Sequence, residues 1–547
     1  MAEMILDIET IQEESTTSTS TPMGNGHETE IKMEKLPEKE EEEEGYSKGY
    51  VSLDDYEEKP ARVEVLGWYF YGFCTYLIHS VLIPIVFPLI VSQTVSWPPQ
   101  PAQGWDKSPR GLVCREKETN LYQRLTHRSI TGNNHNFSPL EWTSISWSIG
   151  LILAAPILGS ISFNLDYGSQ QVLIAAAATA IGAIFCLPVG LFKTVWIFLP
   201  YIAAIVAAHT VSTACHTRQL GLMVSSFRPT TLQQHGIPIR RAVSGWFSIF
   251  ATVAGCVGSA IISAFTYHML RGSLDQEFIS LWIVSIFSGL MWFGGMVHVF
   301  TSHRSKTNPT IPNSKLLYAF SIFKYPRAIG SLVGVFLSSF TTMCIFTGGV
   351  LFIVGQLCLK PVVLLYFWLV YFIFPLISLP LCQPLQHFLK ADAVKMQQLG
   401  FLLSTATSGA GFYFQEKNWK VTVVVIFAAV QGTSTGLLHA FGRVLLLDCS
   451  PSGKEGAFSI WFSWIKSLGT FAGFAVSSAV PGKIGTSFGI AFCSAMLGIV
   501  MFILGNFSDF DGAEDEGHVK DDSERGSPVH GLDAVAETKE HVLQETP

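Results

Sequence analysis

Long apolar segments alternate with short polar connections along most of this 547-residue chain. An apolar run of about 20 residues is long enough to cross the hydrocarbon core of a bilayer. Such runs are helices, because every backbone polar group in a bilayer must be satisfied within its own segment. The pattern predicts twelve of them, over residues 66–93, 142–163, 170–192, 194–215, 242–267, 278–300, 328–355, 361–385, 396–414, 420–447, 456–480 and 484–507. We therefore expect an all-α, polytopic membrane protein with twelve transmembrane helices.

The second half of the helical region repeats the first. Residues 244–264 and 459–479, which lie 215 positions apart, are identical at eight of 21 positions. The residues that pair at this or a similar offset are Gly258 with Gly473, Arg218 with Arg443, and Asp166 with Asp392. The chain is therefore expected to hold two six-helix halves, residues 61–300 and 328–507, in the same orientation and joined by a cytosolic linker, 301–327. Two halves related by an axis along the membrane normal build a facilitator-type carrier with its site between them.

Small residues recur within the repeated segment. Gly258 and Gly473 sit among alanines and serines at helical spacing. Small faces let helices approach closely in lipid, where packing replaces the hydrophobic effect. We expect both glycines on the seam between the two halves, where ordinary close packing would serve as well.

The two ends of the chain are acidic and polar, unlike the apolar region between them. Mean hydropathy is +0.36 and only 14% of residues are charged. Residues 1–60 carry a net charge of −13 and residues 508–547 a net charge of −9, which leaves +15 for 61–507. Both tails are poor in bulky apolar residues, so we expect them to be disordered. An even number of spans places both on one side, and acidic tails without a signal peptide favour the cytosol.

Two stretches resemble a known family. "GWYFYG" (67–72) and "FGRVLLLDCSPSGKEGAFSIWFSWIK" (441–466) resemble the vacuole-effluxer branch of the major facilitator superfamily, typified by the yeast autophagy-related vacuolar amino-acid exporter. The resemblance implies a secondary active transporter that exports neutral amino acids from the vacuole to the cytosol. By this resemblance, the arginine, glutamate and lysine of the family's pattern correspond to Arg443, Glu455 and Lys466. This chain departs from the family at Gly72, where an aspartate is usual.

Lys466 is the leading candidate for a transport residue. It lies about ten residues into its predicted span, near the membrane midplane, where a charge costs at least about 2.5 kcal/mol. Ala251 occupies the equivalent position in the first half, so the fold itself does not require a cation there. Lys466 is thus expected either to meet a substrate or gating acid in a cavity, or to form a structural ion pair.

Other polar residues on the spans are candidates for substrate binding, coupling or gating. Histidine titrates near neutral pH and can carry a coupled proton, although a buried histidine can also be held neutral by hydrogen bonds. An arginine–carboxylate pair can close a gate in one state and open in the other, and an arginine can equally be an interfacial anchor. The binding or coupling candidates are Lys466, His79, His209, Gln356, Gln431 and His439; the gating candidates are Arg443, Asp448, Glu455, Arg218 and Asp166.

Several function classes lack a signature. The sequence has no nucleotide-binding glycine loop, metal-ligand spacing or nucleophile elbow, which argues against an ATP-driven pump, a metalloprotein and a membrane enzyme. We expect a monomer in a lipid bilayer that binds a small solute, with protons a candidate coupling ion and with no cofactor, metal or nucleic acid. The alternatives are a plasma-membrane transporter of another small solute or organic anion, and a carrier-like receptor or scaffold that does not transport.

The long polar loop between the first two spans carries two further candidates. Asn136 begins a glycosylation sequon, and Pro139 follows that sequon directly. Cys114 lies in the same loop, and Cys358 is the other cysteine placed near that face, so a bridge between them is a candidate.

Overall fold

The computed structural model describes residues 60–95, 116–132, 135–168, 171–191, 194–225, 239–275, 281–301, 318–389, 391–450, 453–481 and 483–505. The chain divides into two units, Met1–Tyr56 and Glu57–Pro547, and all described residues belong to the second. The two acidic tails, most of the linker and Cys114 lie outside the described residues. The described part is mostly helical, as the sequence predicts.

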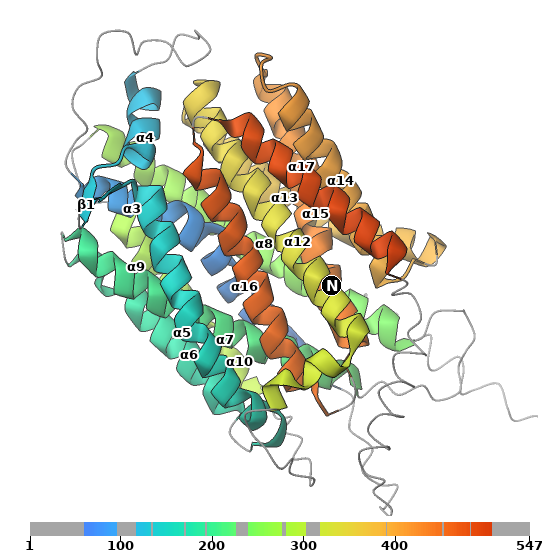
Figure 1. Cartoon of the computed structure of the whole chain (residues 1–547). Coiled ribbons are helices and arrows are strands. Elements are labelled where there is room, and N and C mark those ends of the chain that lie inside the picture. Colours follow the sequence, from blue (N-terminus) through green and yellow to red (C-terminus); the bar gives the residue numbers. More distant parts are fainter. Residues whose placement is uncertain are drawn as a thin grey trace, which may run out of the picture. The chain divides into compact units, whose positions relative to one another are not determined.

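The helices before the linker follow the predicted order (Figure 1). They are α2 (Arg62–Leu77), η1 (Ile78–Val86), α3 (Phe87–Thr94), α4 (Glu116–Thr126), α5 (Pro139–Tyr167), α6 (Gln171–Cys186), η2 (Pro188–Gly190), η3 (Val195–Ile197), α7 (Phe198–Ser225), α8 (Ile239–Asp275), α9 (Leu281–Gly294) and α10 (Val297–Thr301). Between α4 and α5, strands β1 (Ile130–Gly132) and β2 (His135–Phe137) pair antiparallel. Helix α5 begins at a capping box, in which Ser138 and Glu141 satisfy each other's backbone N–H groups.

The helices after the linker form a second series. They are η4 (Ala319–Lys324), α12 (Pro326–Leu351), η5 (Phe352–Gln356), α13 (Val362–Leu389), α14 (Ala393–Tyr413), α15 (Val421–Asp448), α16 (Glu455–Ala479) and α17 (Ile484–Leu504). We call the end of the bundle where α10 ends and α12 begins the linker end, and the opposite end, which carries α4, the loop end. All twelve predicted spans are helical in the described residues.

Ten of these helical segments are long and apolar enough to cross a membrane. The other two predicted spans are α14 and α16, which have 21 and 25 residues. Their length suits a membrane crossing, but hydroxyl, amide and lysine side chains lower their hydropathy. Both pack against several other helices, α14 against α15 and α17, and α16 against α12 and α5.

The packing of the second series repeats that of the first. Helix α2 packs on α8 as α12 packs on α16, and α5 packs on α7 as α13 packs on α15. The two series meet through equivalent pairs, α5 with α16 and α8 with α13. In Figure 1, α16 lies beside α5, although the two are far apart in sequence. The internal repeat in the sequence is therefore matched by a repeat in the helix packing.

The first helix of each series lies at the centre of the bundle. The apolar window of Arg62–Thr94 is 94% buried and that of Pro326–Gln356 is 83% buried, whereas those of Gln171–Gly190 and Leu281–Thr301 are each 39% buried. Pro84 lies inside the π-helical segment η1, which widens the first helix at its middle. Proline removes one backbone hydrogen bond, and π-helical turns are frequent at functional sites.

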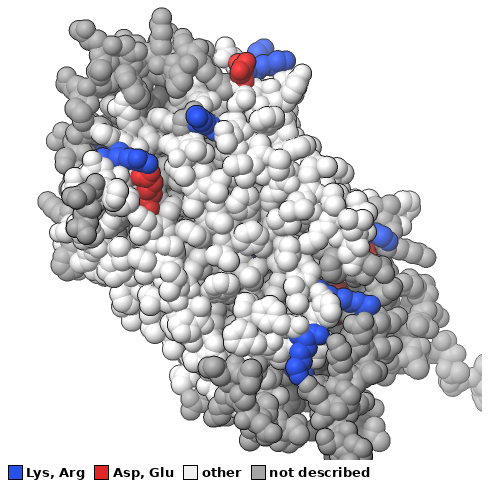
Figure 2. Space-filling view, in the orientation of Figure 1, with Lys and Arg blue, Asp and Glu red and all other residues white. Residues whose placement is uncertain are grey.

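The outer surface carries its charges at the two ends of the bundle. On the face in Figure 2, lysine, arginine and acidic side chains gather near both ends, and the surface between them is uncharged. Large apolar side chains are exposed along the helices, among them Ile152, Leu173, Phe300 and Phe388. Such a band suits contact with lipid acyl chains, because apolar surface of this extent is rare in water.

Candidate functional site

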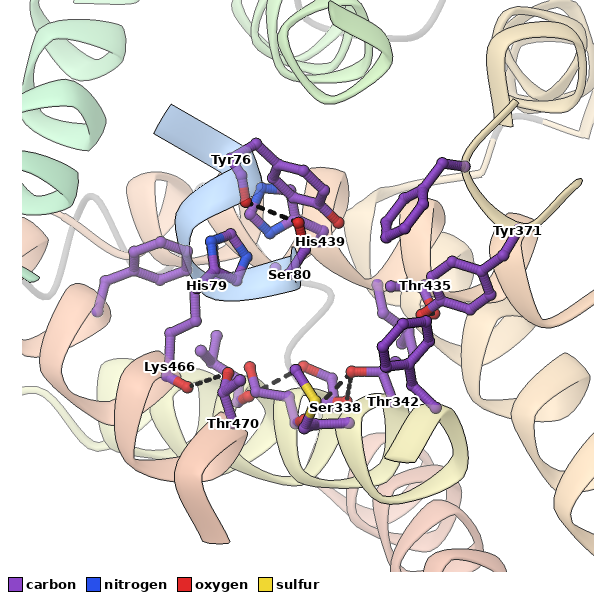
Figure 3. Close-up of a pocket in the computed structure, with 18 residues that line it drawn as sticks. Tyr76, His79, Ser80, Ser338, Thr342, Tyr371, Thr435, His439, Lys466 and Thr470 are labelled. Atoms are coloured by element: carbon purple, nitrogen blue, oxygen red, sulfur yellow. Dashed lines mark hydrogen bonds between the residues drawn. The ribbon is translucent and has the colours of Figure 1, made fainter. Parts of the chain in front are cut away.

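A central cavity lies between the two helix series (Figure 3). It consists of one main pocket and two neighbouring pockets that share His79 and Lys466 with it. The polar residues that line these three pockets include Thr75, Tyr76, His79, Ser80, His209, His216, Ser338, Thr342, Tyr371, Thr435, His439, Arg443, Lys466 and Thr470. They come from both series, so the site forms only when the halves pack together.

Lys466 points into this cavity from α16. It lies eleven positions after the start of the helix at Glu455, about 17 Å along the axis at 1.5 Å per residue. Its Nζ is 6.0 Å from the ring centroid of Tyr76. In the described part of the chain no carboxylate lies within ion-pair distance of Nζ. The described residues therefore show a cavity cation and not a structural ion pair.

Three histidines gather beside Lys466. The ring of His79, on η1, lies 5.2 Å from that of His209 on α7 and 6.0 Å from that of His439 on α15. The Nδ1 atom of His79 is buried and has no hydrogen-bond partner among the described residues. This arrangement brings three predicted residues to one place. No group of three histidine, cysteine or acidic side chains in the described ranges is placed to hold a metal ion.

Arg443 lines the same cavity, one helical turn after His439. Its Nη2 lies 3.2 Å from His439 Nε2 and donates to Thr252 Oγ1 of the other series at 3.3 Å. Its guanidinium carbon lies 5.6 Å from the ring centroid of Trp68. The predicted gating pair of Arg443 with Asp448 or Glu455 is not formed in this structure. The side chain is buried between the two series and is not an interfacial anchor.

A different carboxylate links the two series at the linker end. The Asp166 carboxylate, at the end of α5, accepts hydrogen bonds from the backbone N–H groups of Gly456 at 2.7 Å and Ala457 at 3.0 Å, in the first turn of α16. It also accepts from Arg218 Nε at 3.5 Å and from the hydroxyl of Tyr318 at 2.8 Å. We call this group the Asp166 latch. It joins the first series to the second at the predicted gating residues Asp166 and Arg218.

The latch is buried at the linker end of the bundle, and Tyr318 lies outside the membrane-spanning segments. Burial and the neighbouring Asp166 carboxylate raise the pKa of the Tyr318 phenol, so that this hydroxyl remains a donor. The Arg218 guanidinium donates a second hydrogen bond, of 2.6 Å, to Gln171 Oε1. Glu455, another predicted gating residue, accepts from the backbone N–H of Gly453 at 2.9 Å through Oε2.

Two predicted binding residues do not reach the cavity. Gln431 is fully buried between α15 and α14, where its Oε1 accepts a 2.5 Å hydrogen bond from Thr407. Gln356 ends η5 at the loop end, where η5 packs on α4. Neither lines any of the three cavity pockets. Position on a central helix is not enough, because only one face of each helix meets the cavity.

Several cavity residues were not predicted, although their spacing from predicted residues places them on the same helix faces. Tyr76 precedes His79 by three positions, and His216 follows His209 by seven, so each pair shares a helix face. His216 stacks on Trp68, with ring centroids 4.5 Å apart. No sequence pattern indicated Tyr371, because it lies on α13 and the cavity residues were predicted on other spans.

The two repeated glycines lie elsewhere than expected. A Cβ atom at Gly258 would stand 2.2 Å from the Phe73 carbonyl oxygen of α2, and one at Gly473 would stand 2.4 Å from the Phe340 carbonyl oxygen of α12. Both contacts are within one series, so the prediction that these glycines lie on the seam between halves is wrong. Their close-packing role is the one expected, and it is equivalent in the two series.

The two loop candidates lie at the loop end. Asn136 is exposed on β2, where it pairs with Thr131. Cys358 is disulfide-bonded, and eight other described cysteines are free. Its predicted partner, Cys114, lies outside the described residues.

Known structures share this fold, whereas no family model and no curated protein match the sequence. A bacterial homologue of the iron transporter ferroportin, in an outward-facing state, matches with a TM-score of 0.53 and 12% identity over 81% of this chain and 99% of the other. The human organic anion transporter MFSD10 (TETRAN) matches with a TM-score of 0.52 and 11% identity over 81% of this chain and 100% of the other. These likenesses show an all-α, polytopic fold of the major facilitator type.

Proposed function

We propose that the protein is a secondary transporter that moves a small organic anion across a membrane by alternating access around the central cavity. The observation that carries this proposal is the charge of the cavity. Lys466 and Arg443 line it, and none of the described lining residues is Asp or Glu. A charge inside a membrane costs from about 2.5 to over 10 kcal/mol. An anionic substrate would supply the missing countercharge.

The latch at the linker end supports alternating access. A carrier must close each side of its site in turn, and a small set of bistable contacts suits that task. The Asp166 latch joins α5 to α16 through two backbone and two side-chain donors. These contacts are polar and few, which suits a link that forms in one state and breaks in the other.

Neutral amino acids are a second candidate, favoured by the resemblance and by the hydroxyl groups of the cavity. Ser338, Thr342 and Thr435 offer oxygens that accept hydrogen bonds from an ammonium group. The aspartate that is usual in the resembled family is replaced by Gly72, which lines the cavity near Arg443. An amino acid would thus lack a carboxylate partner for its ammonium group, which favours the anion.

Flux into proteoliposomes tests this proposal. The panel holds acetate, pyruvate and benzoate as anions and leucine and tyrosine as zwitterions, each with and without a proton gradient. We expect anion flux, and we expect Lys466→Ala to abolish it while the protein still purifies as a single species. This variant copies Ala251 of the other half, so its packing is tolerable. Lys483→Ala, which removes an exposed cation outside the cavity, is the control.

The outcomes separate the candidate functions. Leucine or tyrosine flux without anion flux would favour the amino-acid carrier. Flux that is unchanged in Lys466→Ala would remove that residue from the mechanism. Folded protein that moves no solute would support the receptor or scaffold. Dependence of flux on the proton gradient would make the histidines beside Lys466 the first residues to test for coupling. The vacuolar membrane, with the plasma membrane as alternative, stays a prediction that imaging of the tagged chain checks.

A further inference from the structure

We propose that the anion taken by this cavity carries an aromatic ring, which packs on a wall formed by Phe346, Tyr371 and Phe372 while its negative group meets Lys466. This inference rests on the proposed function and narrows its substrate class to aryl carboxylates and similar aromatic anions. It assigns the choice of substrate to the wall opposite the cations.

The two walls of the cavity differ in chemistry. Figure 3 shows His79 and Lys466 on one side of the open space and Tyr371, Thr342 and Thr435 on the other. This asymmetry fixes the orientation of a bound substrate, with its charged end towards Lys466 and its uncharged end towards the opposite wall. Lysine donates to a carboxylate, whereas the far wall offers rings and hydroxyl groups and no charge.

The three rings of the far wall already pack in the geometry that aromatic groups prefer. The ring centroid of Tyr371 lies 4.8 Å from that of Phe346, with the planes tilted by 46°. It lies 5.0 Å from that of Phe372, with the planes at 88°. Tilted and edge-on pairs at such distances are favoured because a ring's positive edge meets its neighbour's negative face. An additional ring in the cavity extends this cluster.

The wall is also fixed in place. The hydroxyl of Tyr371 is hydrogen-bonded to Thr435 Oγ1 at 2.8 Å, which holds its ring against the cavity. Met343 lines the same pocket, and its thioether makes favourable contacts with aromatic rings. A preorganised wall loses little conformational entropy when a ligand binds.

Apolar space continues beyond the rings, whereas the pockets beyond the cations include histidine and hydroxyl side chains in their walls. Phe346 also lines a separate, almost wholly apolar pocket at the loop end, with Pro88, Leu121 and Trp368 among its other residues. The aromatic end of a ligand therefore borders an apolar chamber. The charged end borders the two pockets that share His79 and Lys466 with the central one, and both also contain His209. A ligand bound in the reverse direction would place its charge against apolar walls.

Equilibrium binding of matched acids to the purified full chain tests this inference. Benzoate and cyclohexanecarboxylate carry the same charge and carbon count, but only benzoate is aromatic; acetate and uncharged benzamide complete the set. We expect benzoate to bind about three- to tenfold tighter than cyclohexanecarboxylate. Tyr371→Leu and Phe346→Leu should remove that preference, whereas Tyr371→Phe should keep it. Phe374→Leu, which removes an exposed ring on α13, should leave the preference unchanged.

The result also separates this inference from the proposed function. If all three carboxylates bind equally and each requires Lys466, the anion carrier stands and the aromatic inference is wrong. A preference for benzoate that survives in both leucine variants likewise overturns it. If benzamide binds as well as benzoate, or no carboxylate binds, the proposed function fails together with the inference. Size-exclusion profiles identify variants that do not fold, and the conservative Tyr371→Phe comparison then decides the outcome.

Discussion

The carboxylate of Asp166 accepts a 2.7 Å hydrogen bond from the backbone N–H of Gly456, 290 residues further along the chain. The contact joins the last turn of α5 to the first turn of α16. The N-terminus of a helix carries unpaired N–H groups and a partial positive charge, so a carboxylate is stabilised there. In this protein the carboxylate comes from the other helix series, and the cap becomes a link between the two halves.

Removing the charge of this link should open the linker end. Asp166→Asn keeps one acceptor oxygen but loses the charge that meets Arg218 and the α16 terminus. Hydrogen bonds to charged groups contribute about 1.5–3 kcal/mol, so we expect the closed state to lose about tenfold or more in population. Cys449, which packs against the apolar cluster that holds Phe458, reports the change. Its maleimide labelling, followed by peptide mass mapping, should accelerate by a similar factor.

Asp392→Asn is the matched control for this change. Asp392 is the repeat partner of Asp166, but its side chain accepts from the backbone N–H of Lys395 and caps α14 within its own series. We expect Cys449 labelling to stay at the wild-type rate in this variant. Equal rates in the wild type and Asp166→Asn would show that the latch does not hold the halves together.

The hydrogen bond from Gly456 to Asp166 requires a residue without a side chain at position 456. A Cβ atom at this position would stand 2.5 Å from Asp166 Oδ1, too close for the carboxylate to stay in place. We expect Gly456→Ala to accelerate Cys449 labelling as Asp166→Asn does, and the double variant to add little. Gly159→Ala is the control, because no atom lies within 4 Å of its added Cβ. Additive effects of the two latch changes would contradict a shared contact.

The repeated glycines should be needed equally in both halves. Gly258→Ala and Gly473→Ala each force a methyl group against a backbone carbonyl oxygen of the neighbouring helix. Overpacking of this kind costs about 1–3 kcal/mol. Thermal unfolding in detergent should show a lower midpoint for each variant and an unchanged midpoint for Gly294→Ala, whose added Cβ has open space. An effect in only one half would argue against equivalent packing.

Arg443 should contribute to anion affinity through its charge. Arg443→Gln removes the charge, and a charge-assisted contact of about 1.5–3 kcal/mol corresponds to roughly ten- to a hundredfold weaker anion binding. Thr252→Val removes only the 3.3 Å hydrogen bond to the guanidinium, so its effect should be much smaller. Binding titrations with benzoate compare the two. Similar losses in both variants would assign Arg443 to helix packing and not to the anion.

Cys358 should resist thiol labelling until the protein is reduced. It is disulfide-bonded, eight other described cysteines are free, and Cys114 is the remaining cysteine of the sequence. Non-reducing peptide mapping should therefore find Cys358 joined to Cys114. The exposed Cys493 serves as the control, because it should react with maleimide before and after reduction. A different partner, or a free Cys358 in the native protein, would contradict this pairing.

The sequence alone determined the helices and their duplication. Length and apolarity located the spans, since a bilayer leaves the backbone no other way to satisfy its polar groups. Eight identities in 21 residues disclosed the repeat, and the contrast between Lys466 and Ala251 singled out the cavity cation. These are properties of single segments or of direct comparison between two segments, so they can be found without knowing how the helices pack.

Only the tertiary structure decided which polar residues meet. Gln431 and His439 lie on the same helix, yet only His439 reaches the cavity, because that depends on which face α15 turns inward. Asp166 was expected near a gate, but its partners at Gly456 and Tyr318 come from distant parts of the chain. Contacts between the halves depend on how each helix is rotated and on how closely separate helices approach. The spacing of residues along a single segment predicts neither.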